Sequence, residues 1–434
     1  MTRLVSTHGS TWKPGSTILR SLIATAVLVN ASFGGSHVTA FAQEPSSGQT
    51  TAFVNGLWYD GSGFVPGSMY VRSGVFVQAL SGEPTTTIDL EGAFVLPAFA
   101  EAHHHMVLCE PNRIASFIDA GILYAAILNA RVSSRACQAE FHGNGSVEIV
   151  NALAGITASE AHPSQIGLYF LEKDEIEGEW VHFIDQAEDL DRVLARVEAG
   201  RPDLLKIFLS YSEDYAQLRT DKTIAPWYRG LDPAMVPDIV RKAHSMGLRV
   251  AAHVMSASDF EVAVDSNVDL VAHLPGFAPG AAFTDGDEHP YLLASESDPD
   301  RYRISSEVAA RAAEQDIHVA TTVSGGSPTA SIAENLRTLR DAGVRLLIGS
   351  DRGEFNSVDE AVFLAENALM PAADVVYSLA VSTPQFLFPD RTIGSLESGA
   401  EATFVALRAD PLANIGNLRD PLWVVQRGAV LRQP

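Results

Sequence analysis

The feature that most constrains the fold is a long alternation of short apolar runs and amphipathic helical runs, which follows residue 105 and continues to about residue 388. The run Asp189–Gly200, for example, places its leucines and valines on one side of a helix, and the apolar run Leu204–Leu209 follows it. Because parallel strands are joined by crossovers that are usually helical, the alternation predicts an α/β fold with a parallel sheet. Roughly eight strand candidates favour a closed (β/α)8 TIM-type barrel over an open doubly wound sheet.

Short β-type runs, separated by Gly and Pro turns, flank the alternating region on both sides. One set lies between Thr51 and Leu96, and the second begins near Asp390. We expect the two sets to pair into one small β-sandwich domain built from both termini. The expected organisation is therefore a β domain of residues 43–96 and 389–434, with the barrel at residues 97–388 between its two parts.

The first 42 residues have the outline of a secretory signal peptide. Three basic residues and no acidic residue precede an apolar stretch at 21–33, and Ala40-Phe41-Ala42 supplies a small-x-small cleavage pattern before Gln43. An apolar stretch of about a dozen residues is short for a membrane span. We therefore expect cleavage after residue 42 and a secreted or periplasmic protein without membrane attachment. An uncleaved anchor and a mis-assigned start are the alternatives.

The charge of the chain limits its partners. The 434 residues include 30 Lys and Arg against 53 Asp and Glu, which gives a formal charge of −23. Such an acidic chain is poorly suited to bind nucleic acid or an anionic membrane surface. Both a monomer and a homo-oligomer are compatible with the sequence. Outside the cytoplasm Cys109 and Cys137, the only cysteines, can form a disulfide, and two separate buried thiols are the alternative.

A histidine-rich stretch, Glu101-Ala102-His103-His104-His105, follows the apolar run Ala93–Ala100. Side chains alternate between the two faces of a strand, so His103 and His105 should point to one side and His104 to the other. Two imidazoles on one face at the end of a buried strand can hold a cation. Taken alone, three consecutive histidines are more typical of a polar surface turn.

Four further strand candidates contain a polar or charged residue within the run or at its carboxyl end, where barrel enzymes place their chemistry. These residues are Lys206, His253, His273 and Asp351. Each has an ordinary structural interpretation: a strand histidine is usually a satisfied polar group, Lys206 could extend from an edge strand, and Asp351 could cap a helix. Together with the histidine pair, they give five strand ends with suitable donors, which predicts a metal site.

These residues, in this order, resemble the metal-dependent amidohydrolase superfamily. The segments Leu96–His103 and Ile393–Val405 are similar to that superfamily's first barrel strand and to its return into the β domain. The chain looks most like the imidazolonepropionase-like and prolidase-like members, which have two metals bridged by a carboxylated lysine. The resemblance covers essentially the whole chain after residue 42.

The resemblance implies a ligand set for two divalent metal ions. The first ion would be held by His103, His105 and Asp351, and the second by His253 and His273. Because an ammonium cannot ligate a cation, Lys206 would react with CO2 and bridge the two ions as a carbamate. Burial in an apolar strand favours this reaction, since it lowers the lysine pKa. Nitrogen and oxygen ligands suit zinc and also accommodate Mn, Fe, Co or Ni.

The activity that the resemblance implies is that of an amidohydrolase. A hydroxide bridging two metals would attack the carbonyl carbon of an amide, and the C–N bond would then break. Asp351 would act as general base and pass the proton to the leaving group. The expected small-molecule substrates are a cyclic amide, an N-acyl amino acid or a dipeptide. The same site is compatible with an ester, a lactone or a phosphotriester. A catalytically inactive relative used for binding or scaffolding is a third hypothesis, although every ligand position is retained.

Departures from the superfamily pattern occur at the first strand and in the loops. Glu101 stands where the superfamily usually has Asp, and His104 is an additional residue that we assign to packing. His162 lies where the usual glycine-rich turn after the third strand is missing. His162, Tyr211 and Arg352 follow strand ends and are weaker candidates for substrate contacts, and His162 is equally consistent with an ordinary loop histidine.

Overall fold

The computed structural model describes residues 49–80, 82–105, 110–141, 145–276, 298–324, 330–351, 353 and 355–434. All of these residues belong to one compact unit, Phe41–Pro434. The predicted signal peptide, Cys109 and Arg352 lie outside the described residues. Within the described part of the chain, no helix combines the length and the apolar character that a membrane span requires.

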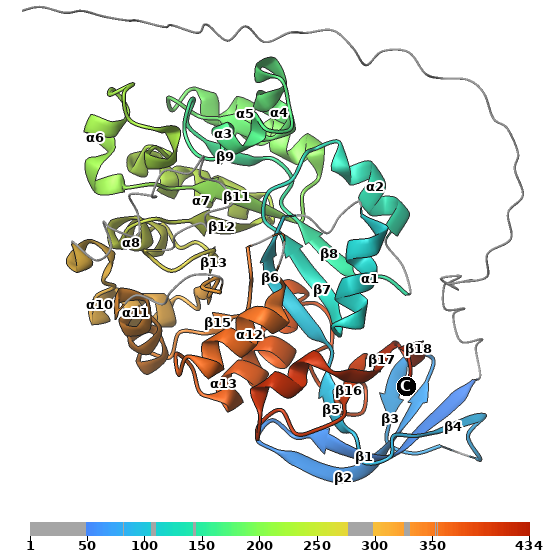
Figure 1. Ribbon diagram of the computed structural model, residues 1–434. Helices are drawn as coiled ribbons and strands as arrows, with labels where there is room; N and C mark the ends of the chain where they lie inside the picture. The colour runs from blue at the N-terminus through green and yellow to red at the C-terminus, as the bar shows by residue number, and fades with distance from the viewer. Residues whose placement is uncertain are drawn as a thin grey trace, which may run out of the picture. The chain divides into compact units, whose positions relative to one another are not determined.

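Parallel strands covered by helices make up the larger part of the described chain (Figure 1). The strands are β6 (Phe99–His104), β7 (Ile122–Ile127), β8 (Glu148–Asn151), β9 (Gly155–Thr157), β10 (Val181–Phe183), β11 (Leu204–Phe208), β12 (Arg249–His253), β13 (Leu270–Val271), β14 (His318–Ala320) and β15 (Leu346–Leu347). They form a three-stranded sheet, β6-β7-β8, and a seven-stranded sheet, β10-β9-β11-β12-β13-β14-β15. The predicted parallel α/β architecture is confirmed, whereas the strand ladders by themselves do not form one closed barrel.

The backbone joins the two parallel sheets at two places. β8 and β9 are consecutive in the chain and are separated by three residues around Leu153, which has a φ of 53°. β8 pairs with β7, whereas β9 pairs with β11, so the chain passes from one sheet to the other at this break. At the opposite end, Ala102 N donates to Ile348 O at 2.8 Å and Asp351 N donates to His103 O at 2.7 Å. β6 therefore lies beside the segment that follows β15, the last parallel strand.

Helices connect the strands and pack on the sheets. They are α1 (Pro111–Asp119), α2 (Ser134–Phe141), α3 (Ser164–Gly167), α4 (Ile176–Glu179), α5 (Asp189–Gly200), α6 (Tyr215–Leu218), α7 (Val236–Ser245), α8 (Ala257–Asp265), α10 (Ser306–Glu314), α11 (Ala330–Asp341), α12 (Ser357–Glu366), α13 (Ala372–Tyr377) and α14 (Thr383–Leu387). α5 buries Leu190, Val193, Leu194 and Val197 along one side, as its apolar periodicity predicts. Burial of such apolar faces is what holds the helices to the strands.

The remaining strands form one eight-stranded sheet that uses both ends of the described chain. They are β1 (Thr50–Tyr59), β2 (Phe64–Arg72), β3 (Val75–Val77), β4 (Thr86–Asp89), β5 (Phe94–Pro97), β16 (Phe404–Leu407), β17 (Pro421–Gln426) and β18 (Ala429–Arg432). The order is β18-β17-β16-β5-β1-β2-β3, and β4 pairs with the first half of β1. Strands from the two termini therefore pair as expected, but a two-sheet sandwich is not confirmed, because these strands belong to a single sheet.

A cluster of half-buried ions joins this sheet to the parallel strands. Its members are Glu148, Arg391, Glu401 and Arg427. Glu148 is the first residue of β8, and it accepts hydrogen bonds from Arg391 Nη1 at 2.6 Å and from Arg427 Nη2 at 3.1 Å. Both arginines also donate to Glu401, so each charge in the cluster has two partners of opposite sign.

Candidate metal centre

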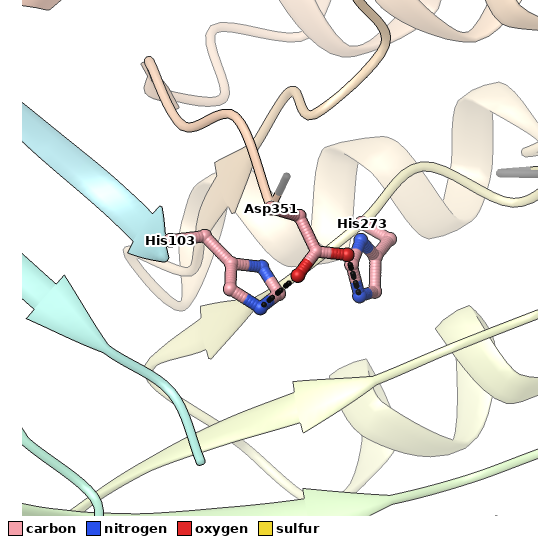
Figure 2. Close-up of side chains that lie close together, drawn as sticks. All are labelled: His103, His273 and Asp351. Atoms are coloured by element: carbon pink, nitrogen blue, oxygen red, sulfur yellow. Dashed lines mark ion pairs between the residues drawn. The ribbon is translucent and has the colours of Figure 1, made fainter. Parts of the chain in front are cut away.

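Three of the predicted ligands meet where their strands end (Figure 2). His103 lies at the end of β6, His273 follows β13, and Asp351 follows β15. Their donor atoms lie within 4.8 Å of one another, a spacing that suits groups holding one cation. His103 Nε2 is 3.1 Å from Asp351 Oδ1, and His273 Nε2 is 3.7 Å from Asp351 Oδ2. The carboxylate therefore lies between the two imidazoles, as Figure 2 shows.

His105 adds another imidazole on the same side as His103. Its Nε2 atom is 2.7 Å from Asp351 Oδ1 and 3.2 Å from His103 Nε2. His104 lies elsewhere: it is fully buried, and its ring packs against the ring of Phe117 in α1, with centroids 5.2 Å apart. The alternation of faces expected along this strand is therefore present in the structure.

Hydrogen bonds at Nδ1 orient three of the imidazoles. The partners are Ala272 O for His103 (3.0 Å), Asn129 O for His105 (3.0 Å) and Thr322 Oγ1 for His273 (2.9 Å). A carbonyl oxygen can only accept, so Nδ1 holds a proton in His103 and His105, and Nε2 is the ring nitrogen that remains for a metal. Nε2 of all three rings faces Asp351, which is the orientation that metal-binding histidines require.

His253 lies beside this group at the end of β12. Its ring centroid is 4.7 Å from that of His273, and its Nε2 atom is 3.1 Å from the sulfur of Met255. Because Nε2 faces Met255, Nδ1 is the ring nitrogen that remains for a metal. His162 is buried and its ring lies 4.5 Å from the His253 ring, so this loop histidine is placed at the site.

Lys206 is buried in the middle of β11, with 1% of its surface exposed. Its Nζ atom makes no hydrogen bond within the described residues and lies 5.4 Å from the centre of the Phe208 ring. Burial lowers the pKa of Lys206 to about 7, although the negative charge of Asp351 opposes this effect. A large fraction of the amine is therefore neutral near neutral pH.

The protonation states at the site are those that a divalent metal needs. Burial, together with the charge of Lys206, lowers the pKa of four imidazoles: His103, His162, His253 and His273. Burial alone would raise the pKa of Asp351, but His103, His105 and Lys206 hold it well below its usual range. Neutral imidazoles, an ionised carboxylate and a buried amine without a partner fit the metal centre that the resemblance implies.

Glu101 fixes the position of two ligand-bearing segments. Its Oε1 atom accepts hydrogen bonds from His103 N and Ser350 N, both at 2.9 Å, and its Oε2 atom accepts one from Ser350 Oγ at 2.9 Å. Burial raises the pKa of Glu101 to about 8, although these bonds favour the ionised form. The glutamate at this position therefore ties β6 to the segment of Asp351.

A second buried carboxylate, Glu360 in α12, was not identified from the sequence. It accepts hydrogen bonds from Val323 N at 2.9 Å and from Ser324 N at 2.6 Å. These residues directly follow Thr322, whose hydroxyl orients His273. The signal in the sequence was a glutamate on the buried side of an amphipathic helix, which requires a polar partner inside the protein.

The remaining weak candidates have different outcomes. Tyr211 is buried just after β11, and its hydroxyl is 3.4 Å from that of Tyr302. Arg352 lies outside the described residues, so its role stays a prediction. Cys137 is disulfide-bonded, and Cys109 lies outside the described residues.

Comparisons with known proteins identify solved structures that are similar to this chain. No protein-family model matches the chain, and no curated protein matches it. Among solved structures, an amidohydrolase has 17% identity and a TM-score of 0.66, and covers 89% of this chain and 100% of its own. A prolidase complexed with N-methylphosphonate-L-proline has 16% identity and a TM-score of 0.65, with coverage of 89% and 100%. A Xaa-Pro dipeptidase with bound methionine has 17% identity and a TM-score of 0.66, with coverage of 88% and 99%.

These similarities define the class of the fold. The structural neighbours are amidohydrolase-like and prolidase-like hydrolases, in agreement with the resemblance found from the sequence. At 16–17% identity the likeness shows a shared fold of the TIM-barrel type.

Proposed function

We propose that this chain is a metal-dependent hydrolase that cleaves a C–N amide bond in a small molecule. The observation that carries the proposal is the grouping of His103, His273 and Asp351 within 4.8 Å at strand ends, in a site where burial lowers the pKa of both histidines. The amidohydrolase and prolidase structures with the same fold support it. A cyclic amide, an N-acyl amino acid and a dipeptide are the substrate classes from which we start.

The residues are assigned to two ions as follows. His103, His105 and Asp351 would hold the first, and His253 and His273 the second. When bound, two divalent ions, with zinc favoured by the nitrogen and oxygen donors, supply Lewis-acid activation of a water and of the substrate carbonyl. The chain contributes imidazole rings that hydrogen bonds already orient, so little reorganisation accompanies binding.

Lys206 is proposed to complete the donor set as a carbamate. The lone pair of its neutral amine forms a bond to the carbon of CO2, one C–O π bond opens, and the nitrogen loses a proton to solvent. The product has two oxygens that share one negative charge in place of a cationic ammonium, and oxygen donors can ligate metals. A pKa near 7 and a buried Nζ without a partner support this assignment.

Asp351 is proposed as the general base. Its carboxylate is ionised, and its backbone N donates to His103 O at 2.7 Å, which fixes the residue in a left-handed conformation with a φ of 54°. In this position Asp351 accepts a proton from the attacking water and returns it to the leaving nitrogen, which must be protonated before the C–N bond breaks.

We further propose that the two parallel sheets close into a (β/α)8 barrel and that the protein is exported. The hydrogen bond from Ala102 N to Ile348 O, between the first and last strands, supports closure. The signal-type segment at 1–42 supports export to the periplasm or beyond the cell. That Cys137 is not a free thiol also fits an oxidising compartment.

Metal analysis combined with an amide panel tests the proposed function. We expect purified protein to contain divalent metal, to hydrolyse at least one member of a panel of lactams, N-acyl amino acids, dipeptides and anilides, and to lose this activity on chelation. If the protein hydrolyses only esters, lactones or phosphotriesters, it is a hydrolase of that class and not an amidohydrolase. Protein that binds no divalent metal and hydrolyses nothing would instead support an inactive binding or scaffold protein.

A further inference from the structure

Asp259 is a buried carboxylate that bonds to the loops after two ligand-bearing strands. It lies in the first turn of α8, and 0% of its surface is exposed. From the loop after β11 it accepts hydrogen bonds from Tyr211 N at 2.9 Å, Ser212 N at 2.8 Å and Ser212 Oγ at 2.6 Å. From the loop after β12 it accepts hydrogen bonds from Met255 N at 2.9 Å and Ser256 N at 3.0 Å. The two loops therefore share one anchor.

These bonds exceed what a helix cap requires. Asp259 forms a capping box with Ser256, and the same motif begins α12, where Asp359 holds the equivalent position. Asp359 is 28% exposed and pairs with Arg419 at 3.1 Å, whereas Asp259 is fully buried and forms no ion pair within the described residues. Because burying a carboxylate away from water costs free energy, its bonds to two loops indicate a role beyond capping α8.

In the loop after β11, Asp259 holds a turn that is unfavourable for the residue that makes it. Tyr211 has a φ of 53°, in the left-handed region that large side chains rarely adopt. The carboxylate accepts hydrogen bonds from the amides of Tyr211 and of the next residue, Ser212, and so stabilises this bend. The bend closely follows Phe208, the last residue of the strand that contains Lys206.

In the loop after β12, Asp259 acts on His253 through Met255. Met255 N donates to Asp259 Oδ2 at 2.9 Å, and the sulfur of Met255 lies 3.1 Å from His253 Nε2. With Nε2 facing this sulfur, Nδ1 is the nitrogen that His253 can offer to a metal. Ser256 Oγ also donates to Glu213 Oε2 at 2.8 Å, which gives the two loops a second link.

We infer that Asp259 is a positioning residue: it holds the ends of the Lys206 and His253 strands together and thereby fixes the site of the second metal ion. Asp259 touches neither ion itself. The inference rests on the proposed hydrolase function and adds a residue to the support of that site. None of the hydrogen bonds of Asp259 reaches the segment of His103 and His105, so the effect of replacing it should fall mainly on the second ion.

Zinc titration of the metal-free full chain, in the presence of bicarbonate, tests the role at the metal site. We expect Asp259→Ala to weaken the second ion about 10- to 100-fold more than the first, and Asp259→Asn, which keeps one carbonyl acceptor, to weaken it less. A general loss of stability would instead weaken both ions alike. The matched control is Ser305→Ala, which removes the cap of α10, a helix of nine residues like α8, and should leave both affinities unchanged.

Hydrogen exchange of the metal-free protein gives a second readout that does not depend on zinc. We expect Asp259→Asn to speed amide exchange about tenfold in both loops, at residues 210–213 and 254–257, and Ser305→Ala to change neither. If exchange rises only within α8, or if the Asp259 variants bind both ions as tightly as Ser305→Ala, the inference is overturned while the hydrolase proposal stands. If wild type binds no zinc, the hydrolase proposal fails, and the exchange measurement alone decides whether Asp259 anchors both loops.

Discussion

Charged side chains near the carboxyl ends of the parallel strands differ in burial and in pairing from those at the amino ends. Around the metal centre Glu101, Lys206 and Glu360 are buried, and none of them forms an ion pair within the described residues, whereas Asp351 contacts only histidines there. At the amino ends the acidic side chains have basic partners: Glu148 with Arg391 and Arg427, Asp269 with His244, and Asp316 with Arg345. A cavity of about 710 Å³ at the amino ends is lined by several of these paired side chains.

This difference indicates that the amino ends contribute mainly to stability and the carboxyl ends to function. Paired ions at the amino ends join strands, helices and the β domain, and their charges are already satisfied. Groups at the carboxyl ends are held by burial in protonation states that they do not have in water, such as the Lys206 amine with a pKa of about 7. Such states are typical of binding and catalytic sites, which is why we place the chemistry there.

The largest expected effect belongs to Asp351. We expect Asp351→Asn to lower kcat/KM by about 10²- to 10⁴-fold, because the amide cannot accept the proton, while much of the metal and the melting temperature are retained. Amide hydrolysis, metal analysis and thermal melting are measured together. The matched control is Asp316→Asn at the amino end of β14, whose activity should stay within about twofold of wild type. Near-normal turnover of the Asp351 variant would refute its role as the base.

The next largest loss of activity is expected for Lys206→Ala, because this variant should lose metal. We expect its metal affinity to fall by about 10- to 100-fold and to recover in part when formate or acetate is supplied. Exposed Lys222→Ala is the control. In wild-type apoprotein, reconstitution with zinc and bicarbonate should slow as the pH falls below about 7, because the amine becomes protonated. Full metal occupancy of the alanine variant without an added carboxylate would exclude a bridging role.

Replacing Glu360 should have a smaller effect, because it would weaken metal binding only indirectly, through the orientation of His273. Glu360→Ala removes the acceptor of Val323 N and Ser324 N, so the Thr322 hydroxyl that orients His273 loses its support. We expect metal affinity to fall about tenfold. Glu360→Gln, which keeps one carbonyl acceptor, should recover part of it. If Glu360→Ala is destabilised but binds metal as tightly as the control Glu366→Ala, the glutamate has only a structural role.

The smallest effect on turnover is expected at the amino ends. Arg391→Ala leaves the half-buried Glu148 and Glu401 each with one partner fewer, so we expect a loss of about 2–4 kcal/mol in the free energy of unfolding. Denaturant unfolding measures this loss. The exposed pair Arg408–Asp420 provides the control, and Arg408→Ala should change stability by less than about 0.5 kcal/mol. A large fall in kcat at 25 °C without loss of stability would break the proposed separation of the two ends.

The sequence was sufficient to predict the parallel strands and the metal-type residues at their ends. Alternating apolar runs define where a strand stops, and parallel strands bring their carboxyl ends together, so His103 and Asp351 meet although 248 positions separate them. The predicted sandwich form of the β domain was not confirmed, since alternation along a strand does not specify whether strands belong to one sheet or two.

The residues that support and surround the ligands could not be predicted. Met255 and Thr322 act through one sulfur or one hydroxyl, and their positions depend on the path of the loop rather than on a periodic pattern. His162 was ambiguous for the same reason, because only the folded loop places it between His253 and Trp227. Loop conformation at the carboxyl ends is therefore where the sequence was least informative.

Titration of metal-free protein with zinc in the presence of bicarbonate, followed by both bound metal and amide hydrolysis, tests the central claim most directly. The claim is that the buried groups at the carboxyl ends form a catalytic centre for two metal ions. We expect activity to be absent at the start, to rise with bound zinc and to saturate at about two ions per chain. Full amide hydrolysis by metal-free protein, or saturation with zinc that never produces hydrolysis, would contradict the claim.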